Sequence, residues 1–527
     1  MFFNRTFHPD EANQAFTTGS LLETGLYQYR PSDHHGPTLY YAAAPLQKAF
    51  GHNDTASLDG TLLRCTPLVF AALAVVLAFF AVRKATRNTL SALFACVLLA
   101  AMPIFAFYST DFIQEMLLAS FSVAMLWAAV DFAAALKTRS EQGNDGVKPG
   151  KRAVFFGMFA GLAFATKETS VFTFASAALA AWCVRPKDPH TQDDCKRSAC
   201  DVNAQANRKS PARNRPESAA IQAALLAAFA FILTAVLFFS SFGAEWGGVY
   251  DAFISAPLSY FHRAAGDAAG GAAWHVHPWW WYAKTLFFPD NIVYSLAFLP
   301  LVVYPLLPRF RKSRLLSFLA LHSLILFALY SIVPYKTPWC MLQVAVPLVL
   351  AYGVLLGEIS SSLRNGRAIA FAAFAIPLAL FAFADVRIWR DPDARDIPYN
   401  YAHASPQVKD LAACVADAIA KSPRPNPSES QHNSHFSILN SQFIAVALPA
   451  CDTWPFPWYN RPLKNVTGYW TSFDALETLA KDGVKPAVVV CRAEYGHLVQ
   501  PLFPHLNRTR RFEMRPHVRV RAFWSEP

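Results

Sequence analysis

Charged residues are scarce in this chain of 527 residues. Asp, Glu, Lys and Arg make up 16% of it, and 54% of its residues are hydrophobic, whereas a soluble domain usually carries about 25% charged residues. The nine cysteines show no spacing typical of a metal site. No internal repeat is visible either. The composition therefore excludes an ordinary soluble protein and indicates a membrane protein.

The apolar residues are concentrated in long runs. Most of these runs approach or reach the ~20 residues that a helix needs to cross a bilayer; the short pair 153–166 and 168–184 would form two thin spans or a re-entrant pair. We count ten candidate spans: 64–82, 89–108, 112–136, 153–166, 168–184, 218–242, 291–308, 315–333, 340–357 and 367–384.

The sequence becomes mixed and polar after residue 385. We therefore expect three regions: an outer loop with interfacial helices (1–63), an α-helical polytopic membrane domain (64–384) and a small water-soluble α/β domain (385–527). In the last region, the pattern predicts helices near 405–421 and 473–481 and strands near 442–449, 486–491 and 509–524. The stretch 17–50 is amphipathic and suits a pair of helices at the membrane surface.

The net charge of +11 reflects membrane orientation rather than nucleic-acid binding. Lys and Arg number 22 in the connections 83–88, 137–152, 185–217, 309–314 and 358–367, against 4 in the alternate connections. This asymmetry follows the positive-inside rule. It places the N-terminal loop and the C-terminal domain outside the plasma (inner) membrane. A segment exported in this way needs a preceding hydrophobic signal, so we expect a first transmembrane helix that this sequence does not contain.

Unusual polar residues fall on the predicted outer side. Charged groups at membrane depth are costly and usually mark function, and their common side predicts one outer cavity. They are Asp10, Glu11, His34, His35, Asp111, Lys167, Glu168, His275, His277 and Lys336.

The order of these motifs resembles a known family. The segment His8-Pro9-Asp10-Glu11, then Gly25-Leu26-Tyr27-Gln28-Tyr29 and His35-Gly36-Pro37-Thr38-Leu39-Tyr40-Tyr41, resembles the first outer loop of GT-C glycosyltransferases related to protein O-mannosyltransferases (glycosyltransferase family 39). Asp111, Lys167-Glu168 and Tyr335-Lys336-Thr337-Pro338-Trp339 fit the same pattern. The resemblance is closest to a bacterial and archaeal branch described as flippase-activity-associated.

The resemblance implies a cell-envelope enzyme that uses a polyprenyl-phosphate sugar donor and a glycan, lipid or protein acceptor. It implies that Asp10 is the general base that removes the proton of the acceptor hydroxyl, and that Glu11 orients or assists Asp10. Lys167, Lys336 and Arg263 would neutralise the lipid phosphate. His34, His35, Tyr40, Asp111, Glu168, His275 and His277 are the further candidates for substrate contacts.

One position departs from the family pattern. Related sugar transferases have a Lys before the Pro-containing turn of the first loop, where this chain has His34-His35-Gly36-Pro37. Neutral histidine binds phosphate less well than Lys, unless a nearby anion raises its pKa.

Simpler roles compete with these assignments. Asp10 and Glu11 would serve as a helix N-cap pair, and Asp111 as the cap of the span that follows it. His34 and His35 would be turn residues, and Lys167-Glu168 a local ion pair. Trp279-Trp280-Trp281 would form an interfacial belt rather than a sugar platform.

No cofactor is implied with certainty. A zinc or manganese site made of His8, Asp10, His275 and His277 is a further alternative, since histidine and carboxylate are common metal ligands. The rival functional class is a transporter or flippase-associated protein without catalysis. It predicts repeated halves or broken helices at the midplane, whereas the polar residues here gather on one side.

Overall fold

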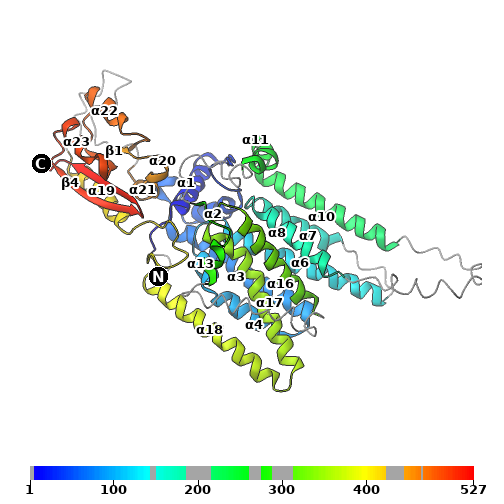
Figure 1. Cartoon of the computed structure of the whole chain (residues 1–527). Coiled ribbons are helices and arrows are strands. Elements are labelled where there is room, and N and C mark those ends of the chain that lie inside the picture. Colours follow the sequence, from blue (N-terminus) through cyan, green and yellow to red (C-terminus); the bar gives the residue numbers. More distant parts are fainter. Residues whose placement is uncertain are drawn as a thin grey trace, which may run out of the picture.

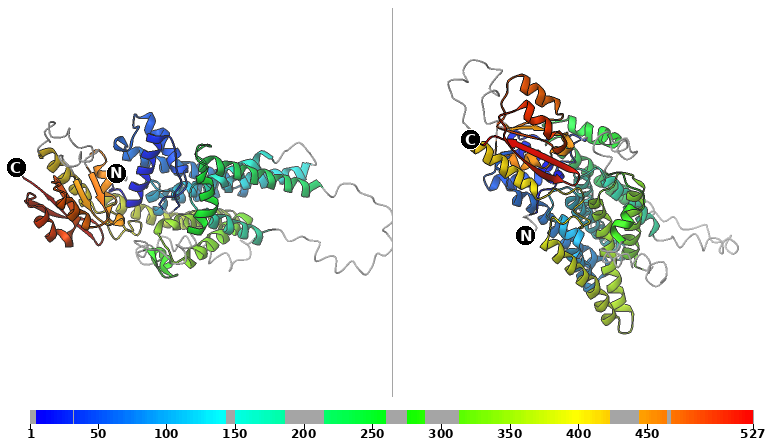
Figure 2. Two further views of the ribbon diagram at one scale, coloured as in Figure 1. Left: turned by 90° about the horizontal axis from the view of Figure 1, so that it is seen from above. Right: turned by 60° about the vertical axis from the view of Figure 1, so that its left-hand side comes forward.

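The computed structural model describes residues 5–31, 33–142, 150–185, 215–259, 275–287, 313–422, 444–463 and 467–526. A bundle of long helices forms the larger part of the molecule, and a smaller domain with a β-sheet extends from one end of it (Figures 1 and 2). The expected fold class, a polytopic helical membrane domain with a small C-terminal α/β domain, is confirmed.

Six helices in the described part of the chain are long and apolar enough to cross a membrane. The protein is therefore a multi-pass membrane protein. These helices are α3 (Gly60–Thr86), α6 (Glu115–Gln142), α10 (Arg215–Phe239), α16 (Arg314–Ile332), α17 (Leu342–Ser362) and α18 (Gly366–Arg390). Two shorter apolar helices, α7 (Gly150–Phe164) and α8 (Ser170–Cys183), occupy the predicted short pair.

The run 89–108 is not one helix. It divides into α4 (Thr89–Ala101) and α5 (Pro103–Tyr108), and Met102 between them is extended, with φ −70° and ψ 121°. Proline disfavours helical backbone in the residue before it, which explains the break. The expected span at 291–308 lies outside the described residues.

Close helix packing in the bundle depends on glycine. A Cβ at Gly353 of α17 would lie 2.3 Å from the Ala95 Cα of α4, and one at Gly357 would clash with Ser91. Likewise, a Cβ at Gly157 of α7 would lie 2.0 Å from the Ala227 carbonyl oxygen of α10. Small residues four apart are what membrane helices use to bring backbones together, because lipid provides no hydrophobic drive for association.

The N-terminal loop forms two helices, α1 (Pro9–Thr24) and α2 (Thr38–Ala49). The amphipathic pattern predicts a helix pair within 17–50, but α1 begins eight residues before that stretch. Both lie at the end of the bundle that carries the C-terminal domain (Figure 1). Short helical segments complete this end: η2 (Thr55–Ser57), α11 (Gly247–Tyr250), η3 (Asp251–Ser255), α13 (Trp281–Phe287) and η7 (Pro338–Met341).

The C-terminal domain contains a five-stranded sheet of order β2-β1-β3-β5-β4. β1 is parallel to β2 and β3, whereas β5 is antiparallel to β3 and β4. The strands are β1 (Ile444–Ala447), β2 (Thr467–Trp470), β3 (Val488–Arg492), β4 (Arg508–Arg515) and β5 (Val518–Trp524). The helical segments are α19 (Gln407–Lys421), α20 (Ala450–Thr453), α21 (Phe456–Asn460), α22 (Asp474–Lys481), η9 (Ala493–Tyr495) and α23 (Gly496–Leu502).

The C-terminal domain contacts the N-terminal loop directly. The Phe7 and Trp458 rings stack with their centroids 4.3 Å apart, and the Phe7 amide donates to the Tyr459 hydroxyl at 2.9 Å. The Arg461 guanidinium donates to the Leu58 carbonyl at 2.8 Å. These contacts hold the start of α1 between the bundle and the sheet domain.

Candidate functional site

A buried ion pair fixes the first turn of α1. The Arg64 guanidinium of α3 donates to both Glu11 carboxylate oxygens, at 2.8 and 2.6 Å, and both side chains are fully buried. Glu11 also accepts from the backbone amides of His8 and Phe112. Burial alone would raise the pKa of Glu11, but Arg64 outweighs it and holds the pKa well below its ordinary value. The Glu11 oxygens are thus saturated with donors.

A second buried pair lies beside the first. Arg5 donates to Asp111 at 3.0 Å, and both side chains are buried. Burial and the neighbouring Glu11 carboxylate raise the pKa of Asp111, and Arg5 opposes this shift. These contacts join the residues before α1 to the connection between α5 and α6. Asp111 therefore anchors the N-terminal segment.

Asp10 has different surroundings from Glu11. Its side chain is 50% exposed, and its Oδ2 atom lies 3.9 Å from His8 Nδ1. That nitrogen already accepts the Asp10 backbone amide at 3.1 Å, and His8 Nε2 lies 3.0 Å from the Tyr401 carbonyl oxygen. His8 Nδ1 therefore carries no proton in this arrangement, and the Asp10 carboxylate is left accessible to a ligand.

Histidine and aromatic rings from four parts of the chain gather beside Asp10. His277 Nε2 lies 3.0 Å from the Tyr401 hydroxyl, and the His277 ring stacks on Trp281 at 4.3 Å. The Trp339 ring contacts His8 edge-on at 5.6 Å. The whole group, which we call the aromatic cluster, consists of His8, His275, His277, Trp281, Tyr335, Trp339 and Tyr401.

Within this cluster His275 is uncharged at neutral pH. Burial lowers the pKa of His275 to about 4, while the Asp10 carboxylate acts in the opposite direction. The buried His275 Nδ1 atom has no hydrogen-bond partner in the described part of the chain. Because the Asp10 charge affects the pKa of His275, the two side chains lie within electrostatic range of each other. Asp10 is thus beside the aromatic cluster.

The pair Lys167-Glu168 is not a local ion pair. Lys167 binds Glu115 at the start of α6, and both side chains are buried. Burial would lower the pKa of Lys167, but Glu115 and the nearby Cys340 raise it above its ordinary value. Cys340 follows Trp339 in sequence, which brings the Lys167 ammonium close to the aromatic cluster.

Glu168 faces the first loop instead. It accepts from His35 Nδ1 at 2.7 Å and from the Tyr29 hydroxyl. Burial opposes ionisation of Glu168, but His35 and Tyr29 together lower its pKa to about 2. His35 therefore has a carboxylate partner at hydrogen-bond distance.

Of the four remaining candidates, the structure describes Lys336, Tyr40 and His34 but not Arg263. The Lys336 side chain is almost fully buried, its ammonium donates to the Val333 carbonyl, and burial lowers its pKa. Tyr40 donates to Gln14, and His34 Nε2 lies 3.0 Å from the Gln28 carbonyl oxygen, so both support the first loop. Arg263 lies outside the described residues.

The described residues contain no group of three or more His, Cys, Asp or Glu that could hold a metal ion.

Several buried charged groups at this site were not identified from the sequence. Arg5, Arg64 and Glu115 each pair with a residue at least 52 positions away. A signal for two of them was available: Arg64 and Glu115 are charged residues at the edges of apolar runs, where charge is costly unless it is paired. Tyr401 of the aromatic cluster and Asp393, which accepts from the Thr6 backbone amide at 3.0 Å, lie in the polar linker after α18, where composition gives no such signal.

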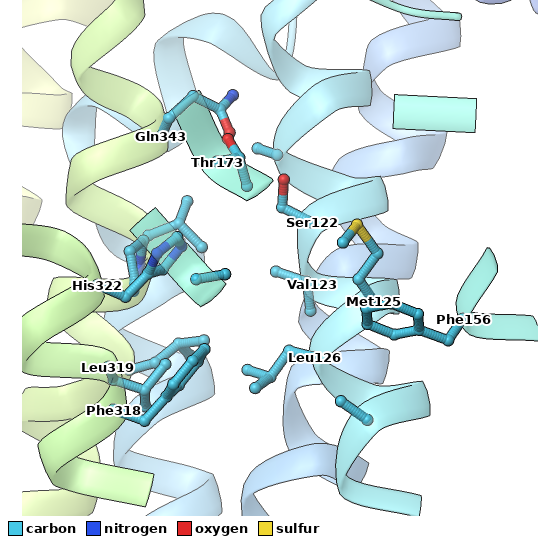
Figure 3. A pocket seen from close by; sticks show the side chains of 16 residues that line it. Ser122, Val123, Met125, Leu126, Phe156, Thr173, Phe318, Leu319, His322 and Gln343 are labelled. Carbon is cyan, nitrogen blue, oxygen red and sulfur yellow. The ribbon is translucent and has the colours of Figure 1, made fainter. Parts of the chain in front are cut away.

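A mainly apolar cavity of about 100 Å³ lies inside the bundle, between α6, α8, α16 and α17 (Figure 3). His322 and Phe318 point into it from one side, and Val123 and Leu126 from the other. Gln343 also lines it and donates to the Glu115 carbonyl at 3.0 Å. The cavity thus approaches the Lys167–Glu115 pair.

Solved structures share this architecture. ArnT from Cupriavidus metallidurans bound to undecaprenyl phosphate matches with a TM-score of 0.59 and 13% identity, over 100% of this chain and 96% of that chain. The same protein in the apo state matches with a TM-score of 0.57 and 12% identity, over 99% of this chain and 95% of that chain. A third match is the archaeal oligosaccharyltransferase AglB from Archaeoglobus fulgidus, in complex with an inhibitory peptide and a dolichol-phosphate. It has a TM-score of 0.52 and 14% identity, over 93% of this chain and 66% of that chain.

No family model and no curated protein sequence matches the chain. Identities of 12 to 14% show a common fold. The chain has the GT-C fold of ArnT and AglB.

Proposed function

We propose that this protein is a membrane glycosyltransferase that moves a sugar from a polyprenyl-phosphate donor to an acceptor hydroxyl outside the plasma membrane. The acceptor is a glycan, a lipid or a protein. We also retain the branch related to protein O-mannosyltransferases, which rests on the motifs of the first loop. The similar structures support the donor class, since ArnT was solved with undecaprenyl phosphate and AglB with a dolichol-phosphate.

The observation that carries this proposal is the contrast between two adjacent carboxylates. Glu11 is saturated with donors, whereas the half-exposed Asp10 faces the aromatic cluster. A general base needs access to the proton that it removes. We therefore assign the base to Asp10 and propose that Glu11 orients the first turn of α1 through Arg64.

The proposed reaction is a single displacement. Asp10 accepts the proton of the acceptor hydroxyl while that oxygen attacks the anomeric carbon. The bond from the anomeric carbon to the phosphate oxygen breaks, and the polyprenyl phosphate leaves with the electron pair. One displacement inverts the configuration at the anomeric carbon. The leaving phosphate needs no strong acid, because cations can stabilise its charge.

We propose that Lys167, Lys336 and His35 supply positive charge to the phosphate, with Arg263 as a further candidate. Lys167 and Lys336 are buried at the end of the bundle that carries α1. The His35 Nδ1 atom is held 2.7 Å from a Glu168 carboxylate oxygen. We propose that His35, bound to Glu168, takes the role of the lysine that related transferases have in the first loop.

The cavity between α6, α8, α16 and α17 supports a lipid-linked substrate. Its walls are mainly apolar side chains of helices that cross the membrane, and it approaches the Lys167–Glu115 pair through Gln343. We propose that it receives part of the isoprenoid chain.

Transfer from labelled donors tests the proposed function. Membranes that contain the full chain are incubated with a panel of radiolabelled polyprenyl-phosphate sugars, and matched membranes without the chain are the control. We expect label to move from the lipid fraction into an acceptor with only some of the donors. Equal label in both membrane samples for every donor would contradict the proposal and favour the non-catalytic class.

A further inference from the structure

The β4–β5 hairpin carries a large excess of positive charge. Between Arg508 and Trp524 it contains Glu513 as its single acidic residue. Its arginines are Arg508, Arg510, Arg511, Arg515, Arg519 and Arg521. Arg511 pairs in register with Arg521, and Glu513 pairs with Arg519, so these four side chains lie on one face of the hairpin. Arg510 lies on the opposite face, in register with the buried Ala522.

A polar cavity of about 540 Å³ opens beside this face. Its walls come from the linker after α18, from η9 and from the turn between β4 and β5. The ionisable side chains that line it are Arg395, Arg492, Glu494, Glu513, His517 and Arg519. A volume of this size falls within the range of ordinary small-molecule sites.

The charges of the wall do not cancel. Arg395 binds Glu513 at 2.7 Å, and Arg492 binds Glu494 at 3.3 Å and also Asp452. Arg519, which is exposed, forms no ion pair with any residue that the structure describes. One guanidinium in the cavity is therefore available to a ligand. Its planar fork of donors suits a phosphate or carboxylate group.

The cavity lies close to the Asp10 site. Asp393 accepts from the Thr6 backbone amide at 3.0 Å, and Arg395, two residues further along the linker, lines the cavity. Two residues span about 7 Å at most. Arg515, which precedes the turn, contributes to the lowered pKa of His275. The cavity and Asp10 thus share one end of the molecule.

We infer that this cavity binds an anionic group, phosphate or carboxylate, carried by the acceptor. The inference deepens the proposed function, on which the role as an acceptor site rests. A group held by Arg519 would leave the rest of the acceptor free to extend toward Asp10. The anion has two sources of one chemistry: a charged sugar of a soluble glycan, or the head group of a lipid in the outer leaflet.

Binding of small charged sugars tests the cavity without any transfer reaction. The full chain in phosphatidylcholine nanodiscs is titrated with glucose 6-phosphate, glucuronate and uncharged glucose, and binding is followed by saturation-transfer NMR. We expect both charged sugars to bind and glucose not to bind. Arg519→Gln should weaken binding about tenfold, because one charge-assisted contact is lost. Glu513→Gln should tighten it, since a negative wall charge is removed.

Arg510→Gln is the matched control, because it removes one arginine from the same strand but from the other face of the hairpin. Its binding should stay within about twofold of the unmodified chain. Equal binding by Arg519→Gln, or equal loss in Arg510→Gln, would overturn the inference, as would absence of binding to the unmodified chain. Melting curves of all variants check that the domain stays folded.

A second set of nanodiscs, containing phosphatidylglycerol, separates the two sources. If phosphatidylglycerol competes with glucose 6-phosphate, and Arg519→Gln abolishes this competition, the cavity binds lipid head groups. If phosphatidylglycerol does not compete, the cavity binds glycans. The same titration on Asp10→Asn should give unchanged binding. Failure of sugar transfer would therefore be a separate result from failure of this site.

Discussion

Two neighbouring carboxylates at the start of α1 contribute very differently to the free energy of unfolding. Glu11 is fully buried and bound by Arg64 through two hydrogen bonds, whereas the Asp10 side chain is half-exposed. Removing one partner of a buried ion pair leaves an uncompensated charge and usually costs about 3–5 kcal/mol. An exposed carboxylate in the first turn of a helix contributes about 0.3–1 kcal/mol. The two residues should therefore separate stability from function.

We predict that Glu11→Gln lowers the free energy of unfolding by about 3–5 kcal/mol, because Arg64 is left buried without its anion. Asp10→Asn should lower it by at most about 1 kcal/mol. Thermal unfolding of the two detergent-solubilised variants, side by side with the unmodified chain, measures the difference. Similar melting temperatures for both variants would show that the ion pair does not hold α1.

The Glu168–His35 contact makes stability depend on pH. The pKa of Glu168 is about 2 in the folded protein, against 4.5 for an unperturbed Glu. A depressed folded-state pKa contributes stability that is fully present above pH 4.5 and is lost as the pH falls toward 2.

We predict that Glu168→Gln destabilises the protein at pH 6 by roughly 3 kcal/mol, and that this deficit shrinks as the pH falls from 4.5 to 2. Unfolding midpoints measured across this range, relative to the unmodified chain at each pH, give the deficit. Glu477→Gln, on the exposed surface of α22, is the control and should show no deficit. A deficit for Glu168→Gln that is constant with pH would contradict the assignment.

At the scale of elements, glycine seams determine how closely the membrane helices pack. The Gly353 and Gly357 face of α17 lies against Ser91 and Ala95 of α4, with no room for a Cβ on either glycine. Van der Waals contact is a main source of helix association in lipid, so this seam carries part of the stability of the bundle.

We predict that Gly353→Val separates α17 from α4 and destabilises the bundle by about 1–3 kcal/mol, as overpacking does. The unfolding midpoint in detergent, followed by reaction of buried thiols, measures the loss. Ala372→Val, on the exposed surface of α18, introduces the same final side chain and should be neutral. Equal stability of the two variants would show that the α17–α4 contact tolerates a wider spacing.

Much of this element structure could be predicted from the sequence, because long apolar runs have few alternatives to helices in a membrane protein. The prediction failed where a local rule interrupts a run, as Pro103 does between α4 and α5. It also missed β2, a strand of four residues. The site was predictable in part. The motif of the first loop singles out Asp10, whose role stays a prediction, whereas Arg64 and Arg395 act through contacts across 53 and 118 positions, which spacing in one sequence does not encode.

At the scale of the whole molecule, α1 and the sheet domain lie at one end of the bundle (Figures 1 and 2). The aromatic cluster lies at the same end, because its member His8 precedes α1 and contacts Trp339 and the Tyr401 carbonyl. The distribution of Lys and Arg predicts that this end lies outside the cell. A polyprenyl-phosphate sugar would then have to be presented in the outer leaflet.

We predict that a membrane-impermeant maleimide labels Lys485→Cys but not Arg364→Cys in intact cells, in a chain whose nine native cysteines are replaced. Both positions are exposed, the first before β3 and the second between α17 and α18. Permeabilised cells should allow labelling of both, which controls for reactivity. The reverse pattern in intact cells would invert the orientation.

The central claim, that Asp10 is the base in sugar transfer, is tested most directly by the rate of one turnover. The purified full chain is preloaded with a labelled polyprenyl-phosphate sugar that passed the membrane screen, acceptor is added, and transfer is timed for the unmodified chain and for Asp10→Asn. We expect Asp10→Asn to keep its fold and its donor binding but to transfer the sugar about 10²–10⁴-fold more slowly, because the acceptor hydroxyl loses its proton acceptor. Transfer by Asp10→Asn at the rate of the unmodified chain would contradict the claim.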